Sequence, residues 1–413
     1  MATFIIPPVF HIRSCPIISH LIRLQRKLIY DFWSCFFVFH KSDYRDWNAM
    51  TSRQELQYLP KAHLHIHLDG AMRPATLAKL CRKYGIQRPV DTRGKRFANF
   101  IGFNEVYRAA CDCIRTRDDL SRVIFEVAED AAHQGVFWIE PAFDAERYST
   151  LREDNPYRLF DTQREGWQFA LSAAEKASQA TGVGIGYISA VDRTRPPEQG
   201  LNRAQVTAEL AHSKEHLIQS GMECFHGKHP GIVAFGLHGN EEGNPPQLFE
   251  QVFQLGLADT GLLSTPHAGE IAPFPGQGAA SVASAVNCLG ANRVQHGVLA
   301  FKDKELLKQL AREGVCLDVC PSSNIQLSVF PTIETHPLPE ILRAGVPCSI
   351  GSDDPLLFGP NLLDEYELCR NQMGLSDELI ATLARNSFLH SGAPQEVKSA
   401  GIAAVDKWLN TGS

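Results

Sequence analysis

Short apolar runs rich in Val, Ile and Phe recur along the chain from residue 59 onward, and longer amphipathic stretches separate them. This alternation is typical of strands and helices that succeed one another around a parallel sheet. There are eight such runs, and eight parallel strands close a (β/α)8, or TIM, barrel. They cover residues 62–68, 135–143, 183–191, 232–239, 262–270, 293–298, 315–323 and 347–355. The pattern therefore predicts an α/β fold made of a single TIM barrel.

The amphipathic stretches between these runs are predicted to form helices, among them residues 119–134 and 303–314. A doubly wound open sheet is the alternative architecture, because Gly182, Gly184 and Gly186 lie together around the start of the third run. These glycines lack the full G-x-G-x-x-G spacing of a dinucleotide site. We therefore expect them to serve tight packing or a strand turn.

The first 49 residues differ in composition from the rest of the chain. They contain six Phe and two Trp but no acidic residue before Asp31. Their longest apolar run, residues 32–39, is eight residues long. Because about 20 residues are needed to span a bilayer, no membrane partner is expected. We predict that residues 1–49 are an atypical extension outside the folded domain and that residues 50–413 form the barrel. An organelle transit peptide is the alternative.

Composition excludes several classes of protein. Of the 413 residues, 44% are hydrophobic and 21% are charged, as in an ordinary globular protein. Forty Lys and Arg against 46 Asp and Glu leave a net charge of −6, so no basic field favours nucleic acid as a partner. The eleven Cys form no C-x-x-C pair. This usage is typical of free thiols in a reducing compartment and predicts a cytoplasmic protein.

Polar residues gather at the carboxyl ends of the predicted strands, in the segments HIHLDG, LHGNEEG, HAGE, QHG, CPSSN and GSDDP. In a TIM barrel these ends converge on one mouth, where active sites are assembled from several strands. Side chains hundreds of residues apart in the sequence can therefore share one cavity. We expect a metal site at this carboxyl-terminal mouth, for the following reasons.

Three histidines alternate along the first predicted strand. His63, His65 and His67 face the same side, which in a barrel is the interior. Buried imidazoles are costly without partners, and an H-x-H pair presents two nitrogens to one divalent ion. His267 and Asp353, at the ends of the fifth and eighth runs, complete a set that suits one Zn²⁺ per chain. Histidines satisfied within the core are the alternative interpretation of the strand.

Three further residues at the same mouth offer chemistry. Glu270, the last residue of the fifth run and three residues after His267, lies where a general acid/base would stand, with helix capping as the alternative. His296, at the end of the sixth run, is placed to orient or polarise the attacking water. Adjacent residues point apart, so Asp354 cannot easily bind the same ion as Asp353 and is left for a substrate.

These motifs resemble the adenosine/adenine deaminase family of metal-dependent purine deaminases, which are TIM barrels. The likeness runs from Leu59 to Ala393 and rests on HIHLDGA, GLHGNEEG, STPHAGE, RVQHGV, VCPSSN and GSDDP, in the order of the family. Cytidine-type zinc deaminases match less well, because the sequence lacks their H-x-E and P-C-x-x-C signature. The resemblance implies an enzyme, a hydrolase of C–N bonds that releases ammonia from a small purine substrate.

The resemblance also implies a role for each residue at the mouth. The metal ligands would be His65, His67, His267 and Asp353, holding Zn²⁺. The catalytic residues would be Glu270, His296 and Asp353. The substrate-binding residues would be His67, Asp69, Gly239 and Asp354. Glu270 would protonate N1 of the purine, while His296 and Asp353 would position and deprotonate the water that attacks C6. Asp354 would bond N7, and the backbone N–H of Gly239 would bond N3.

Two motifs bear on the substrate in opposite ways. Asp69 in HLDG resembles the nucleoside deaminases, where this carboxylate faces the sugar 5′-hydroxyl, and its charge would repel a 5′-phosphate. The segment GLHGNEEG instead resembles adenine deaminases and leaves His238 and Asn240 without explanation. Adenosine, converted to inosine, is the predicted substrate. Adenine, or a modified adenosine such as aminodeoxyfutalosine, is the alternative.

Two arginines near the expected mouth leave a further choice open. Arg193 and Arg195 follow the third run, either as solvated loop charges or as a site for an acidic group on such a modified adenosine. A non-catalytic barrel with a vestigial metal site is the alternative from another class of protein. The presence of every expected ligand together with Glu270 argues against it.

Overall fold

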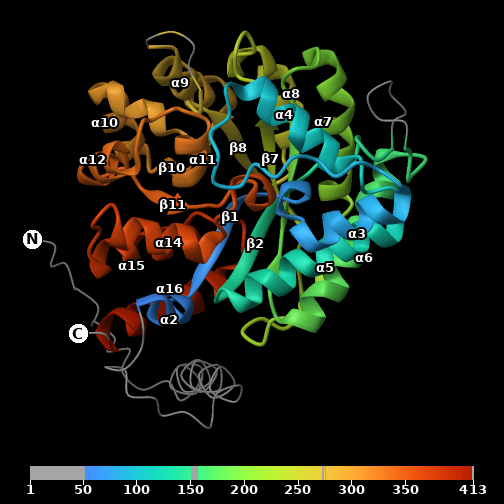
Figure 1. Cartoon of the computed structure of the whole chain (residues 1–413), viewed down its shortest axis with the longest axis horizontal. Helices are drawn as coiled ribbons and strands as arrows, with labels where there is room; N and C mark the ends of the chain where they lie inside the picture. The colour runs from blue at the N-terminus through green and yellow to red at the C-terminus, as the bar shows by residue number, and fades with distance from the viewer. Residues whose placement is uncertain (1–51, 150–156, 272–273, 275, 412–413) are drawn as a thin grey trace, which may run out of the picture. The chain divides into compact units, whose positions relative to one another are not determined.

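The computed structural model describes residues 52–149, 157–271, 274 and 276–411 (Figure 1). The predicted extension, residues 1–49, lies outside these ranges, so its boundary stays a prediction. In the described ranges no helix is long and apolar enough to cross a membrane. The nine cysteines in the same ranges are free thiols.

Eight parallel strands form the barrel, in the order β1-β2-β4-β7-β8-β9-β10-β11. Their bounds are β1 Lys61–His67, β2 Val136–Phe143, β4 Tyr187–Asp192, β7 Ile232–His238, β8 Leu263–Ala268, β9 Arg293–His296, β10 Cys316–Val319 and β11 Cys348–Ile350. A bridge between Ile66 and Asp353 joins the two ends of this order. The predicted TIM barrel is therefore confirmed, and each of the eight apolar runs overlaps one of its strands.

Helices surround the strands in Figure 1. They are α2 Ser52–Tyr58, α3 Pro74–Tyr84, α4 Phe100–Cys111, α5 Arg117–His133, α6 Gln163–Thr181, α7 Pro197–His212, α8 Glu250–Leu257, α9 Gln277–Leu289, α10 Lys304–Glu313, α11 Pro321–Gln326, α12 Leu338–Arg343, α13 Pro355–Phe358, α14 Leu362–Asn371, α15 Asp377–Leu389 and α16 Gln395–Thr411. The predicted helices 119–134 and 303–314 correspond to α5 and α10. Local caps define their starts: Thr116 and Asp119 form a capping box before α5, and Asp303 caps α10.

The third apolar run differs from its prediction, because it is divided into β3 (Gly184–Ile185) and β4, both paired with β2. The glycines of this run let Trp138 pack against it. A Cβ on Gly184 would lie 2.3 Å from the Trp138 ring, and one on Gly186 would lie 2.7 Å from it. The packing interpretation of these two glycines is thus confirmed.

A fully buried ion network lies inside the barrel. Arg293 at the start of β9 contacts Glu140 of β2 at 2.6 Å and Asp318 of β10 at 2.9 Å, and none of the three side chains is exposed. Ser349 of β11 also donates to Asp318, at 2.7 Å. The network therefore ties three strands of the barrel together through one guanidinium group.

We expect the substitution Arg293→Met to lower the free energy of unfolding by about 3–5 kcal/mol, because it leaves two buried carboxylates without their counter-charge. Urea denaturation followed by circular dichroism measures the change. Arg312→Met is the matched control, since Arg312 is 71% exposed and pairs only with its neighbour Glu313 among the ion pairs seen. A loss below about 1 kcal/mol for Arg293→Met would contradict the importance of the network.

Candidate active site

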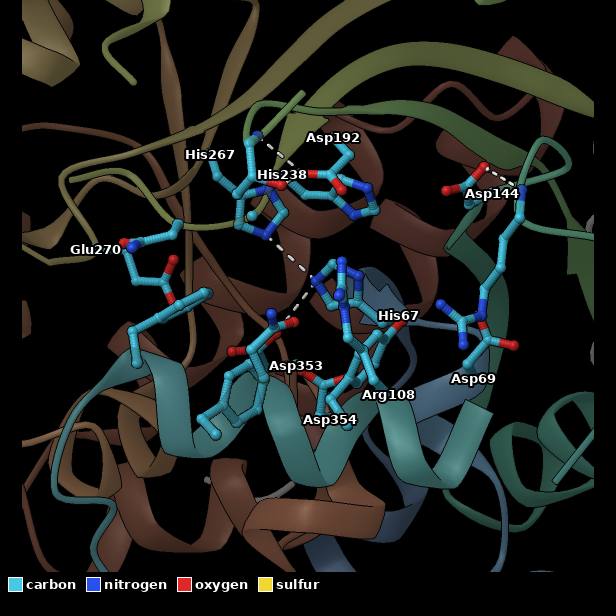
Figure 2. Close-up of a pocket in the computed structure, with 18 residues that line it drawn as sticks. His67, Asp69, Arg108, Asp144, Asp192, His238, His267, Glu270, Asp353 and Asp354 are labelled. Carbon is cyan, nitrogen blue, oxygen red and sulfur yellow. Dashed lines mark hydrogen bonds and ion pairs between the residues drawn. The ribbon is translucent and has the colours of Figure 1, made fainter. Parts of the chain in front are cut away.

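Four predicted ligands, from strands β1 and β8 and the segment after β11, meet at the carboxyl-terminal mouth of the barrel. His65, His67, His267 and Asp353 are all buried, and one donor atom from each lies within 4.8 Å of the others. The Nε2 atom of His67 is 3.3 Å from Nε2 of His267 and 3.3 Å from Oδ1 of Asp353 (Figure 2). The Nε2 atom of His65 is 3.5 Å from the same Oδ1.

Backbone carbonyls orient two of the imidazoles. Nδ1 of His65 lies 2.8 Å from the carbonyl oxygen of Asp318, and Nδ1 of His267 lies 2.8 Å from that of Leu237. A carbonyl can only accept, so each Nδ1 carries the proton and each Nε2 presents its lone pair to the cluster. Nε2 of His65 is buried and has no hydrogen-bond partner among the described residues. Three imidazoles and one carboxylate are a donor set that fits a divalent metal ion, and the unpartnered Nε2 atom of His65 is available to bind it.

Asp353 is held by its backbone as well as by its neighbours. Its N–H donates to the His65 carbonyl at 3.1 Å, and its own carbonyl accepts from the His67 N–H at 3.0 Å. Asp353 and His296 both adopt left-handed backbone conformations, with φ of 58° and 63°. Such strain costs of order 1–3 kcal/mol for a residue other than glycine and is concentrated at functional sites.

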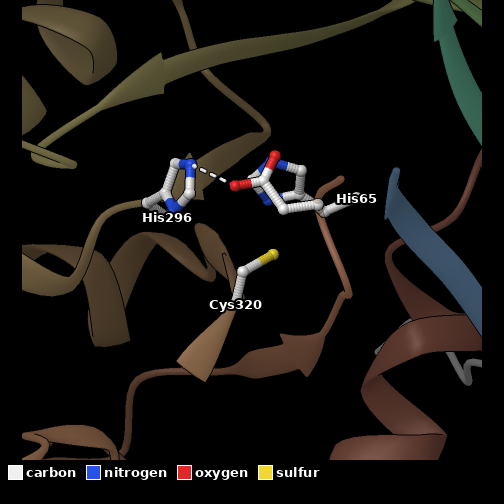
Figure 3. Close-up of side chains that lie close together, drawn as sticks. His65, His296 and Cys320 are labelled. Carbon is white, nitrogen blue, oxygen red and sulfur yellow. Dashed lines mark ion pairs between the residues drawn. The ribbon is translucent and has the colours of Figure 1, made fainter. Parts of the chain in front are cut away.

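His296 lies between two carboxylates at the edge of the cluster. Its Nε2 atom is 3.4 Å from Oε1 of Glu270 and 3.7 Å from Oδ2 of Asp353. Figure 3 shows it facing His65, with the thiol of Cys320 nearby. Burial raises the pKa of Glu270 well above its usual value, and the negative charges of Asp353 and Glu241 add to the shift. Glu270 is therefore suited to carry a proton near neutral pH.

The cluster opens into a cavity whose empty volume is about 910 Å³, a figure that includes open solvent at its mouth. The predicted residues that line it are His67, Asp69, Gly239, His267, Glu270, Asp353 and Asp354. His65 and His296 do not line the cavity but contact residues that do. The structure thus brings every predicted site residue to one place.

Asp69 and Asp354 lie on this cavity wall with different partners. The Tyr148 hydroxyl donates to Asp69. Oδ1 of Asp354 is buried and has no hydrogen-bond partner within the described ranges. Burial raises the pKa of Asp354 well above its usual value, and the charge of Asp353 raises it further. A Cβ on Gly70 would lie 1.6 Å from that same Oδ1, so only glycine leaves room for Asp354 in HLDGA.

A sequence model of the adenosine deaminase family matches residues 60–408. The chain belongs to the adenosine deaminase family. It is 34% identical over 368 residues to a putative adenosine/adenine deaminase of Streptomyces virginiae, covering 87% of this chain and 99% of that protein. It is also 34% identical over 360 residues to an aminodeoxyfutalosine deaminase of Streptomyces coelicolor, covering 85% and 86%. This adenosine deaminase family member is therefore a hydrolase of C–N bonds that deaminates adenine, adenosine or a modified adenosine.

A solved structure supports the same assignment. The adenine deaminase of Arthrobacter aurescens superposes with a TM-score of 0.72 and 26% sequence identity, covering 85% of this chain and 99% of that one. The barrel of our deaminase is thus shared over nearly the whole length of that relative. The resemblance to the adenosine/adenine deaminase family inferred from the motifs is confirmed.

Part of the cavity wall of this deaminase was not predicted. One side is formed by α4, through Phe100, Phe103, Asn104, Tyr107 and Arg108. Asp144, Arg147, Asp192 and Thr194 also line the cavity, as do His238 and Asn240. Asp144 directly follows β2 and Asp192 ends β4. Their positions at the carboxyl ends of strands could therefore have predicted that they line the cavity. No such signal marks α4, because it lies in the long connection between β1 and β2.

The structure also shows where His63 and Arg193 lie, two residues for which the sequence left more than one interpretation open. Nε2 of His63 accepts the Ser352 N–H at 3.1 Å, so His63 is a satisfied core histidine. Arg193 is only 1% exposed, and its Nη1 donates to the His267 carbonyl at 3.0 Å. Arg193 does not line the cavity. It is therefore neither a solvated loop charge nor a direct site for an acidic substituent.

Proposed function

We propose that this deaminase acts on a 6-aminopurine nucleoside, adenosine being the expected substrate and inosine and ammonia the products. The observation that carries the proposal is the position of Asp69. Asp69 and Glu270 line one cavity and lie on opposite sides of His67 in Figure 2. A purine with its N1 at Glu270 leaves the Asp69 side for a sugar, whose hydroxyl would donate to the carboxylate. Free adenine would leave this side unfilled.

His65, His67, His267 and Asp353 are the residues we propose to hold one Zn²⁺. A divalent ion held there supplies Lewis acidity, which makes water a usable nucleophile at neutral pH. His296 lies 3.7 Å from Asp353 and 3.4 Å from Glu270, so its imidazole is placed to accept a proton from the attacking water. The net change replaces the 6-amino group by oxygen, with water consumed and ammonia released.

Three residues would hold and activate the purine ring. Addition at C6 breaks the aromatic delocalisation, so a proton must reach N1, and Glu270 is the group suited to donate it. N7 accepts hydrogen bonds, so Asp354 can bond it only when protonated. The raised pKa of Asp354 favours that form. Gly239, with a φ of 95°, lines the same cavity, where its N–H would bond N3.

Adenine and aminodeoxyfutalosine are the second candidates. The relatives described above carry the names of deaminases for both substrates. His238 and Asn240 also line this cavity, and the resemblance to nucleoside deaminases does not explain them. His238 lies parallel to His67, with ring centroids 5.8 Å apart. A substrate comparison separates these candidates from adenosine.

We expect Asp69→Asn to lower kcat/KM for adenosine by roughly 10–100-fold, the worth of a hydrogen bond to a charged group. The rate with free adenine, which has no sugar, should not change. Ammonia release from adenosine, adenine and aminodeoxyfutalosine, measured in parallel for both proteins, tests this. A wild type that prefers adenine, or a variant that loses both activities equally, would argue against a sugar contact at Asp69.

A further inference from the structure

Glu241 lies in the GLHGNEEG segment after β7 and is held against a different loop. Its carboxylate accepts three consecutive backbone N–H groups from the turn after β8. Gly269 donates to Oε1 at 2.7 Å, while Glu270 and Ile271 donate to Oε2 at 3.1 and 3.2 Å. These donors do not belong to a helix, because α9 begins at Gln277. Glu241 is 7% exposed, so the three bonds are made in a largely dry environment.

Arg193 holds the other end of the same turn. Its Nη1 donates to the carbonyl of His267, three residues before Glu270, at 3.0 Å. Its positive charge acts on both Glu241 and Glu270. A buried carboxylate such as Glu241 requires compensation by charge and hydrogen bonds, and Arg193 and the three N–H groups supply both. The segment from His267 to Ile271 is thus held by an anion at one end and a cation at the other.

Glu241 itself does not line the cavity, so it is not placed to touch a substrate. It also does not belong to the metal-ligand cluster. Glu241 instead contacts the backbone of Glu270, the residue proposed to protonate the purine. Catalytic groups must be held within about 0.5 Å of their productive geometry, and a 1 Å misplacement can cost about 10²-fold in rate.

We propose that Glu241 is a positioning residue, whose carboxylate fixes the Gly269–Ile271 backbone so that the Glu270 side chain stays beside His296 and the cavity. This inference rests on the proposed role of Glu270 as the acid. It gives a function to one residue of the GLHGNEEG segment, Glu241. His267, a proposed metal ligand, and Glu270, the proposed proton donor, are thereby kept in a constant position relative to each other.

The variant Glu241→Gln tests the proposal. An amide has only one oxygen, and its NH2 group would face a backbone N–H, so at least one of the three bonds is lost. Glu242→Gln is the matched control, because Glu242 is the exposed neighbour of the same type. The assay is ammonia release from whichever of adenosine, adenine and aminodeoxyfutalosine the wild type deaminates fastest. Bound metal and the thermal midpoint are measured on the same samples.

We expect Glu241→Gln to lower kcat by roughly 10–100-fold, with KM and bound metal close to wild type, and Glu242→Gln to behave as wild type. In the Glu270→Gln background, Glu241→Gln should cause little further loss, because the two residues act as one unit. If Glu241→Gln does not fold, Glu241→Asp keeps the charge but shortens the reach, and it should lower kcat in the same way.

A wild-type kcat in Glu241→Gln or Glu241→Asp, beside a strongly impaired Glu270→Gln, would overturn the positioning role alone. A full additional loss in the double variant would overturn it too, since Glu241 would then act independently of Glu270. An active Glu270→Gln would instead remove the proposed acid, and with it the function on which this inference rests.

Discussion

We expect the substitution Glu270→Gln to lower kcat by roughly 10²–10⁴-fold, the range for loss of a general acid or base. Gln has nearly the same size as Glu, so the cavity and the Glu241 contacts to the Glu270 backbone are kept. It cannot release a proton to N1, whereas the pKa of Glu270 is raised by burial and by neighbouring carboxylates so that the acid form is favoured. Steady-state ammonia release measures the change.

Metal analysis of the same variant provides the control. Glu270 does not belong to the set of side chains that could hold an ion together, so the bound metal should stay at the wild-type level. Loss of activity with the metal retained would assign the defect to proton transfer. A kcat within about threefold of wild type would refute the role of Glu270, because even weak general catalysis contributes about 10²-fold.

Removal of the metal should have an equally large effect. We expect dialysis against a chelator to reduce deamination to background and addition of Zn²⁺ to restore it, because a bound divalent ion lowers the pKa of water to about 7 and so makes it a nucleophile at neutral pH. Stability should fall as well, since an ion that binds only the folded protein contributes about 4.1 kcal/mol at 1,000 times its dissociation constant.

His65→Ala provides the genetic counterpart of chelation. His65 is fully buried, and its Nε2 has no hydrogen-bond partner in the part of the chain that the structure describes. Loss of this proposed ligand should lower both the bound metal and the activity, and added Zn²⁺ should restore little. Full activity in protein from which metal analysis detects no divalent ion would exclude the proposed site. The measurements are elemental analysis, the ammonia assay and urea denaturation.

The fold and the meeting of the four proposed metal ligands were predictable because strand alternation and the number of strands can be read directly from the chain. Alternation along β1 places His65 and His67 on the same face, whatever the rest of the chain does. Eight strands predict a closed barrel, and closure brings the strand ends that carry His267, His296 and Asp353 to the same mouth. Asp144 and Asp192 could have been found by the same argument, since both stand at strand ends.

Other parts of the site depend on contacts between segments that no local pattern relates. The sequence by itself determined the barrel and the residues at its mouth, through strand periodicity and strand number, and it indicated the family through the resemblance of its motifs. Only the tertiary structure decided that α4 forms a cavity wall, that Arg193 is buried against His267, and that Glu241 holds the Glu270 backbone. These contacts arise from the packing of connections of unequal length, which the periodicity of individual strands and helices does not encode.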